Sequence, residues 1–203
     1  MDLTYAESSL RILDFDIECQ PGAWIGSDYT TKRLLSIAAA WIVDGQPVDL
    51  ECKTVRPRKG ARASILRWFL TLYDEADMVT GHFIRGYDLP VLQGAYMRHH
   101  LPLLGQKLTL DTKNDLAKVS GISKSQENLG ALYELKHPKE PMTTIDWEDA
   151  ADLTPEGLHQ LETRNRRDVE QHVELLGAML EAGPLGAPTM WLPHGNGTSK
   201  YTP

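Results

Sequence analysis

The feature that most constrains the fold is the short spacing of three β-rich segments in the first third of the sequence. Residues 11–17 and 34–43 are apolar runs, and residues 47–55 alternate apolar and polar side chains. Asp44-Gly45 is a tight-turn signal between the second and third segments. Since parallel neighbours need a long crossover, these short links predict an antiparallel meander of three strands.

The next segments alternate between helical and strand patterns. Apolar residues recur at helical spacing over 65–73, and the short apolar segment 77–81 then predicts a fourth strand that is parallel to an earlier one. Residues 89–100 predict a second helix, and residues 107–110 predict a fifth strand with Asp111 at its end. The sequence therefore predicts an α/β fold with a mixed five-stranded sheet, three strands antiparallel and two parallel, flanked by helices.

The last part of the chain predicts further helices and a tail. Two short helices are expected around 113–119 and 126–135. Thr154-Pro155 is a strong helix start, a capping residue followed by proline at the first helical position. That helix can run to about residue 182. We expect one domain over 1–183 and an irregular tail over 184–203, which is rich in glycine and proline.

Charge and hydropathy exclude several classes of protein. The net charge of −7 argues against a broad, sequence-independent grip on duplex nucleic acid, although basic residues gather at Arg56–Arg62 and Arg164–Arg167. The longest apolar run, 34–43, is too short to cross a membrane. The N-terminus lacks the pattern of a signal peptide, and the two cysteines suggest reduced thiols. We therefore expect a cytoplasmic protein that makes no membrane contact.

Four acidic residues are candidates for a functional site because of their positions in the predicted elements. Asp16 and Glu18 lie two residues apart on the first strand, so their side chains share one side of it and repel each other unless a cation lies between them. Asp88 follows the fourth strand where a helix begins, and Asp168 interrupts the apolar stripe of the last helix. Each also has a purely structural interpretation. Asp16 and Glu18 could lie at an exposed strand end, Asp88 could cap a helix, and Asp168 could form a salt bridge with Arg164.

Taken together, three segments resemble a known family. Residues 13–18 (LDFDIE), 87–92 (YDLPVL) and 165–169 (NRRDV) are similar to the three motifs of the DEDD 3′–5′ exonucleases, which have a ribonuclease-H-like fold. The nearest group is that of the small phage and bacterial exonucleases related to the proofreading domain of family B DNA polymerases. The resemblance extends from about residue 10 to residue 176.

The resemblance implies a metal-dependent reaction. It assigns Asp16, Glu18, Asp88 and Asp168 as catalytic residues that hold two divalent cations, Mg²⁺ or Mn²⁺. Hard cations prefer such oxygen ligands, and a pair of them activates a water and stabilises the leaving 3′ oxygen. The implied substrate is a nucleic-acid 3′ end, with single-stranded DNA favoured and RNA left open. If the chain is phage-encoded, it would act in the host cytoplasm.

The chain departs from the family pattern at two motifs. The third motif has Arg164 and Thr163 where the family has a tyrosine or histidine beside the attacking water, and Phe83 replaces an asparagine after Gly81-His82. Arginine stays protonated and is no general base. His172, one turn beyond Asp168, has a suitable intrinsic pKa, although a lone helical histidine is more often structural.

Further residues are assigned to substrate contacts. These are Ile17, His82, Arg164, Asn165 and Trp24. Arg164 is suited to bidentate phosphate contact, and Trp24 either stacks on a base or anchors the core.

Three functions therefore remain open from the sequence. The first is a 3′–5′ exonuclease that releases 5′-mononucleotides, alone or within a replication or repair assembly. The second is a catalytically weakened module that binds nucleic acid or a partner protein. The third is an endonuclease that uses the same metals.

Overall fold

A mixed six-stranded sheet forms the centre of the computed structural model, which describes residues 10–20 and 33–193. The strands are β1 (Ile12–Gln20), β2 (Arg33–Val43), β3 (Gln46–Thr54), β4 (Met78–Gly81), β5 (Lys107–Asp111) and β6 (Thr189–Trp191). The helices are α1 (Ala61–Glu75), α2 (Asp88–Arg98), α3 (Gln126–Leu132), α4 (Thr144–Ala151) and α5 (Pro155–Ala182).

The topology of the first five strands agrees with the sequence prediction. The strand order is β3-β2-β1-β4-β5-β6. β1, β2 and β3 form the antiparallel meander, and β4 and β5 are added in parallel beside β1. Asp44 and Gly45 join β2 to β3 with positive φ angles of 52° and 73°, as the twist of a two-residue hairpin requires. The mixed α/β class is thus confirmed.

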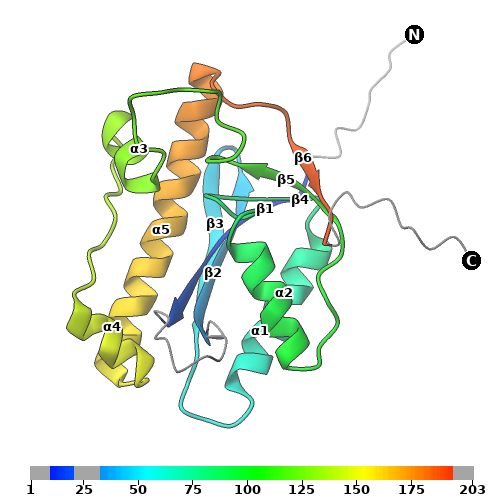
Figure 1. Ribbon diagram of the computed structural model, residues 1–203, viewed down its shortest axis with the longest axis vertical. Helices are drawn as coiled ribbons and strands as arrows, with labels where there is room; N and C mark the ends of the chain where they lie inside the picture. Colours follow the sequence, from blue (N-terminus) through cyan, green and yellow to red (C-terminus); the bar gives the residue numbers. More distant parts are fainter. Residues whose placement is uncertain (1–9, 21–32, 194–203) are drawn as a thin grey trace, which may run out of the picture.

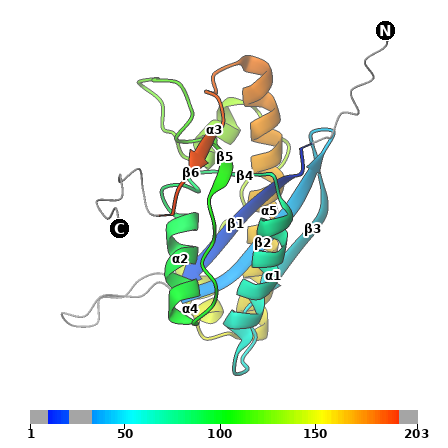
Figure 2. The ribbon, with the colours of Figure 1, turned by 90° about the vertical axis from the view of Figure 1, so that its right-hand side faces the viewer.

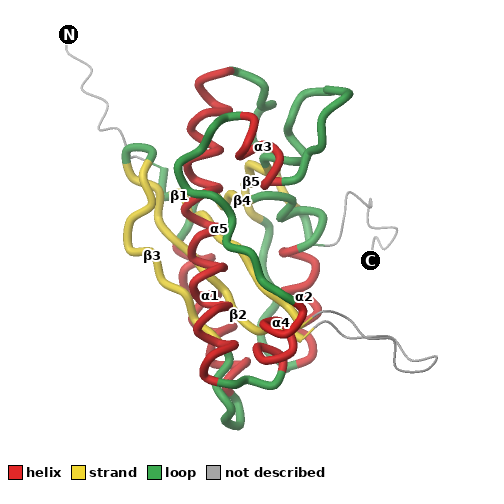
Figure 3. The backbone as a smooth tube through the Cα atoms, turned by 90° about the vertical axis from the view of Figure 1, so that its left-hand side faces the viewer, coloured by secondary structure: helices red, strands yellow, loops and turns green. Residues whose placement is uncertain are grey.

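Helices cover both faces of the sheet. α1 and α2 pack on one face, where Phe69 and Leu92 join a large apolar core with β1 (Figure 1). α5 crosses the opposite face, where Val169 and Val173 pack on Ala38 of β2. Figure 2 shows the sheet between these two layers. α3 and α4 lie along α5, with α4 near its N-terminal end (Figure 3).

Strand β1 faces both layers, and this position sets the location of the polar groups. Its odd-numbered residues Leu13, Phe15, Ile17 and Cys19 belong to the core under α1 and α2. The side chains of its even-numbered residues therefore point toward α5. One of them, Asp14, is fully buried. The same strand thus supplies apolar packing on one side and three carboxylates on the other.

The sixth strand was not predicted. β6 lies in the segment expected to be an irregular tail and pairs antiparallel with β5, with Trp191 opposite Lys107. Its three residues are too few to show a periodic pattern. The strand forms because the edge of β5 offers unpaired backbone groups, and Trp191 packs against the main core. The division at residue 183 remains a prediction.

The helices also differ from the prediction in two places. The segment 113–119 is not helical, because its backbone bonds go elsewhere: the Ala117 N–H donates to the Pro184 carbonyl at 2.9 Å. Conversely, α4 was not predicted. It begins with a capping box in which Thr143 and Asp146 each accept a hydrogen bond from the other's backbone N–H.

Candidate active site

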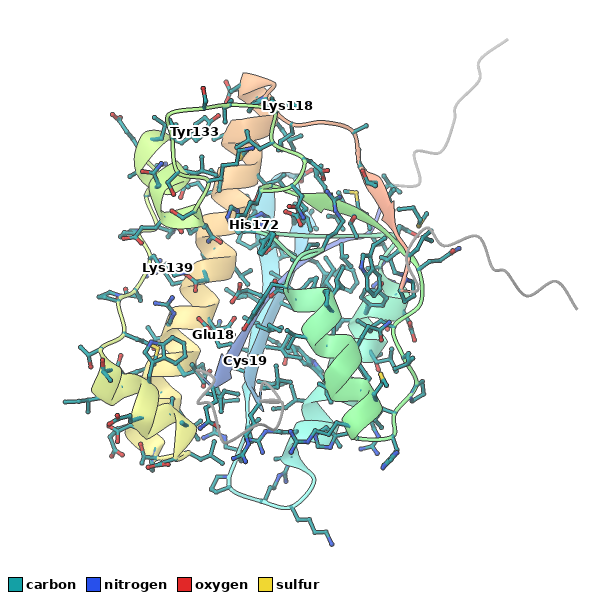
Figure 4. All side chains as sticks on the ribbon, viewed as in Figure 1. Glu18, Cys19, Lys118, Tyr133, Lys139 and His172 are labelled. Atoms are coloured by element: carbon teal, nitrogen blue, oxygen red, sulfur yellow. The ribbon has the colours of Figure 1, made fainter. Side chains whose placement is uncertain are left out.

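Three of the predicted carboxylates converge between β1 and α5. Asp16 and Glu18 project from β1 toward Asp168, near the middle of α5, and one ligand oxygen from each lies within 4.8 Å of the others. They line an open cleft of about 270 Å³, which we call the acidic cleft. Figure 4 shows Glu18 at this junction between strand and helix. The convergence follows from the alternation of β1 and from the inward position of Asp168 on its helix.

Asp88 lines the same cleft from the first turn of α2. One of its carboxylate oxygens accepts a hydrogen bond from the Ile17 N–H at 3.3 Å, which ties the start of α2 to β1 between the other two acids. Asp88 lies outside the group whose oxygens approach within 4.8 Å. The structure therefore brings all four acids to one cleft, with three of them in close contact.

Burial and mutual repulsion disfavour the charged forms of these acids. Burial raises the pKa of Asp16 well above its usual value, and the neighbouring carboxylates raise it further. Burial also raises the pKa of Asp88 to about 8. The pKa values of Glu18 and Asp168 are raised by burial too, although nearby cationic side chains oppose the rise.

Two cationic side chains of the protein contact this group. The Arg164 Nε donates to Glu18 Oε1 at 2.8 Å and lies 3.7 Å from Asp168 Oδ2, so the predicted salt bridge to Asp168 is shared with Glu18. A second guanidinium nitrogen donates to the Glu140 carbonyl at 2.6 Å. Lys139 Nζ lies 3.3 Å from Asp168 Oδ2. The chain thus neutralises part of its own carboxylate cluster.

The donor set fits divalent cations. Asp168 Oδ1 is buried and has no hydrogen-bond partner in the described structure, which is costly for a charged oxygen unless a cation binds it. The three clustered ligands are all carboxylates, the donors that hard cations such as Mg²⁺ prefer. The cluster Asp16, Glu18 and Asp168 is thus able to hold a metal ion.

The loop that leads to Asp88 is fixed by Asp111 at the end of β5. Asp111 accepts hydrogen bonds from the backbone N–H groups of Phe83 and Arg85, both at 3.0 Å. Phe83 has a φ of 67°, which is rare for a bulky residue. A Cβ on Gly86 would lie 2.2 Å from its ring. Phe83 therefore has a defined place at the rim of the cleft.

Arg85 stabilises this loop through side-chain hydrogen bonds. Its guanidinium forms two hydrogen bonds with Asp115, at 2.5 and 3.0 Å, and a third with Thr109 at 3.2 Å. Asp115 in turn accepts from the Asp111 N–H at 2.8 Å. This largely buried arrangement holds the end of β5 and the approach to α2 together.

A chain of hydrogen bonds fixes the orientation of His82 in the cleft wall. Burial lowers the pKa of His82 to about 3, so the ring is neutral. Its Nε2 lies 3.0 Å from the Lys124 carbonyl, which only accepts, so Nε2 carries the proton and Nδ1 accepts from Thr112 Oγ1 at 2.9 Å. The Thr112 hydroxyl then accepts from His172 Nε2, also at 2.9 Å.

The chain ends at a buried acid. His172 Nδ1 lies 2.5 Å from Asp14 Oδ2, so this ring and this carboxyl form a buried hydrogen bond. His172 is buried, and its two ring nitrogens contact Thr112 and Asp14 rather than the acidic cleft. Its predicted part in catalysis stays a prediction, and its observed contacts are structural.

The remaining predicted substrate residues fall into three groups. Ile17, His82 and Arg164 line the acidic cleft. Asn165 is buried and donates to Ser36 Oγ of β2 at 2.7 Å, so it faces the sheet. Trp24 lies outside the described residues. Four further residues line the cleft that the sequence analysis did not assign to the site, namely Lys113, Ser125, Gln126 and Lys139.

Comparison with known proteins gives structural similarity only. No family model and no curated protein matches the chain. A solved family B DNA polymerase from the hyperthermophilic archaeon Pyrobaculum calidifontis is similar in structure, with a TM-score of 0.62, 17% sequence identity and 85% of this chain covered. The match covers 25% of the polymerase chain. The chain therefore has a mixed α/β fold, compatible with the ribonuclease-H-like class, that is similar to part of a DNA polymerase.

None of the described helices is long and apolar enough to span a membrane.

Proposed function

We propose that this chain is a metal-dependent 3′–5′ exonuclease that hydrolyses the terminal phosphodiester bond of a nucleic-acid strand. The observation that carries the proposal is the convergence of Asp16, Glu18 and Asp168 within 4.8 Å, with Asp88 in the same cleft. The resemblance of three sequence motifs and the similarity to a polymerase fold support it. The substrate would be a 3′ end, with single-stranded DNA preferred, and the products would be 5′-mononucleotides.

The four carboxylates would form one metal site in the proposed mechanism. Two divalent cations, when bound, supply an activated water and stabilise charge on the leaving 3′ oxygen. Asp16, Glu18 and Asp168 would hold the cations, and Asp88 would complete the set from an orientation fixed by the Ile17 N–H. Because cations replace protons on acids with raised pKa values, metal binding would release protons and strengthen with rising pH.

The cationic side chains would act on the phosphate. Arg164 and Lys139 form ion pairs with the acids in this structure, and these pairs would weaken where the same oxygens hold a cation. Their charged ends would then be available to a phosphate in the cleft. Arg164 remains protonated and would not act as a general base.

The test is degradation of a 5′-labelled single-stranded oligonucleotide with Mg²⁺ or Mn²⁺. We expect a ladder that shortens from the 3′ end and disappears with EDTA and in Asp16→Asn. The matched control is Glu181→Gln, which removes an exposed acid at the far end of α5 and should cleave normally. Cuts at internal positions would indicate an endonuclease instead.

A second candidate function is a nucleic-acid-binding or partner-binding module without turnover. The observation that favours it is the Arg164–Glu18 ion pair, which places a cation of the protein where a metal ligand is proposed. Arg164→Tyr separates the two functions. A slow exonuclease should gain activity when the family's tyrosine is restored, whereas a binding module should show no cleavage in either form.

A further inference from the structure

A second cavity, of about 320 Å³, lies between the start of β2, the first turn of α1 and one side of α2. Its basic walls are Arg33, Arg62, Arg98 and His99, and its apolar walls include Val91 and Ala95. We call it the basic pocket. Its volume is at the lower end of the range of small-ligand sites and suits a group the size of one nucleotide.

The positive charges of the basic pocket have no acidic partners among the described residues. The Arg62 Nε donates to the Leu34 carbonyl at 2.9 Å, which holds this half-buried guanidinium in place. The pKa of Arg62 is lowered by burial and by Arg33 and Arg98, and the pKa of His99 is lowered by burial and by Arg98 and Arg62. The cationic groups therefore repel one another in a chain of net charge −7. Such an arrangement favours an anionic ligand.

The basic pocket adjoins the acidic cleft along two elements. Leu34 pairs with Cys19, the residue after Glu18, and Pro90 of the pocket wall lies two residues after Asp88. Arg98 lies at the opposite end of α2 from Asp88, about 15 Å away at roughly 1.5 Å per residue. At about 3.4 Å per stacked nucleotide, a strand would span this distance with roughly four to five nucleotides.

We propose that the basic pocket binds one nucleotide of the strand whose 3′ end lies in the acidic cleft, several nucleotides from that end. Its phosphate lies against the arginines, and its base lies against Val91 and Ala95. The identity of the bound strand as the substrate rests on the proposed exonuclease function. The binding of a single-stranded nucleic acid by these residues does not require cleavage.

The test measures binding without cleavage, by fluorescence anisotropy in EDTA. Labelled single-stranded oligonucleotides of about 4 and about 12 nucleotides are compared, since single-strand sites span about that range. Arg33→Ala combined with Arg98→Ala should weaken binding of the longer strand about tenfold, the effect of roughly 1.4 kcal/mol. The slope of log affinity against log salt should fall by about 0.7, the effect of one lost phosphate contact on a single strand. The shorter strand should be affected less.

The matched control removes the same charge elsewhere. Arg67→Ala combined with Lys118→Ala deletes two exposed cations that do not line the basic pocket, and Lys118 lies at the top of the molecule, well above Glu18 (Figure 4). A general charge effect would weaken binding equally in both double variants. Equal loss, or no loss in the Arg33/Arg98 variant, overturns the proposal.

A second pair of variants leaves every arginine in place. Gly94 lines the basic pocket, and a Cβ there would meet no atom within 4 Å. Gly94→Glu would place a carboxylate among the arginines and should reduce binding of the longer strand at least as much as the double variant. Gly94→Ala, the control for the added Cβ, should bind normally. Full binding by Gly94→Glu contradicts the proposal.

Two further outcomes are informative. One distinguishes a strand from a free mononucleotide as the ligand, and the other distinguishes failure of the pocket proposal from failure of the proposed exonuclease function. If a free 5′-mononucleotide competes as well as the longer strand does, the pocket is a mononucleotide site and the strand assignment is wrong. If the pocket variants lose binding but the wild type cleaves neither DNA nor RNA, the binding site stands and the proposed exonuclease function fails.

Discussion

The acidic cleft and the basic pocket lie toward opposite ends of α2 and hold their charges in opposite ways. In the cleft, the acids contact cations supplied by the chain, with Arg164 on Glu18 and Lys139 on Asp168. In the pocket, the arginines face one another without an acidic partner among the described residues. The negative charge of the cleft is thus partly neutralised by the chain itself, whereas the positive charge of the pocket remains available to a ligand. Four predictions, from the largest expected effect to the smallest, test this difference.

The cleft should be essential for chemistry and dispensable for strand binding. Asp168→Asn removes a ligand oxygen while keeping the shape of the side chain. We expect activity to fall about 10³-fold, equivalent to roughly 4 kcal/mol of lost transition-state stabilisation. Strand binding in EDTA should stay the same or strengthen, because a negative charge is lost. A loss of binding equal to that of the pocket variants would remove the distinction between the two regions.

The cleft should also depend on buried ion pairs for its shape. Arg85→Ala leaves Asp115 without its partner beneath the loop that leads to Asp88, and the two side chains are only 16% and 8% exposed. We expect a loss of about 3 kcal/mol in the free energy of unfolding, measured by urea denaturation. Glu75→Gln, which breaks the exposed pair with Arg11, should cost less than about 1 kcal/mol. Similar losses would mean that Arg85 has no special structural part.

The two regions should respond differently to acid. The folded pKa of His82 is about 3, below the unfolded value, so the unfolded state takes up more protons as the pH falls below about 6.5. His82 should therefore cost about 1–2 kcal/mol of stability between pH 7 and pH 5, and this cost should disappear in His82→Gln. His99→Gln, in the more exposed pocket, should change the pH dependence less. Thermal unfolding across this pH range checks both.

The smallest effect concerns glycines in the two regions. Gly94→Ala should raise the free energy of unfolding by about 0.5–1 kcal/mol, because alanine favours a helix and the added Cβ meets nothing. Gly86→Ala should instead destabilise the protein, since its Cβ would displace the Phe83 ring from the rim of the cleft. A stabilising Gly86→Ala would show that the Phe83 ring moves freely.

The sequence predicted those parts of the structure that depend on local pattern. The strand alternation that joins Asp16 to Glu18 and the inward position of Asp168 both follow from the period of a single element. Lys139 was missed because it lies in an irregular segment, His137-Pro138-Lys139-Glu140, and reaches Asp168 only through the folded path of the chain. β6 was missed for a similar reason, because its formation depends on an edge supplied by a distant strand.

Helix α5 carries three key polar side chains at four-residue intervals, namely Arg164 and Asp168 at the acidic cleft and His172 on Asp14. Each successive residue of an α-helix turns by about 100°. Inserting or deleting one residue between Arg164 and Asp168 would therefore turn these two side chains relative to each other, and both could no longer face β1. The mid-section of α5 should therefore tolerate no change in length. In related chains, insertions and deletions should fall in the connecting loops and spare this helix.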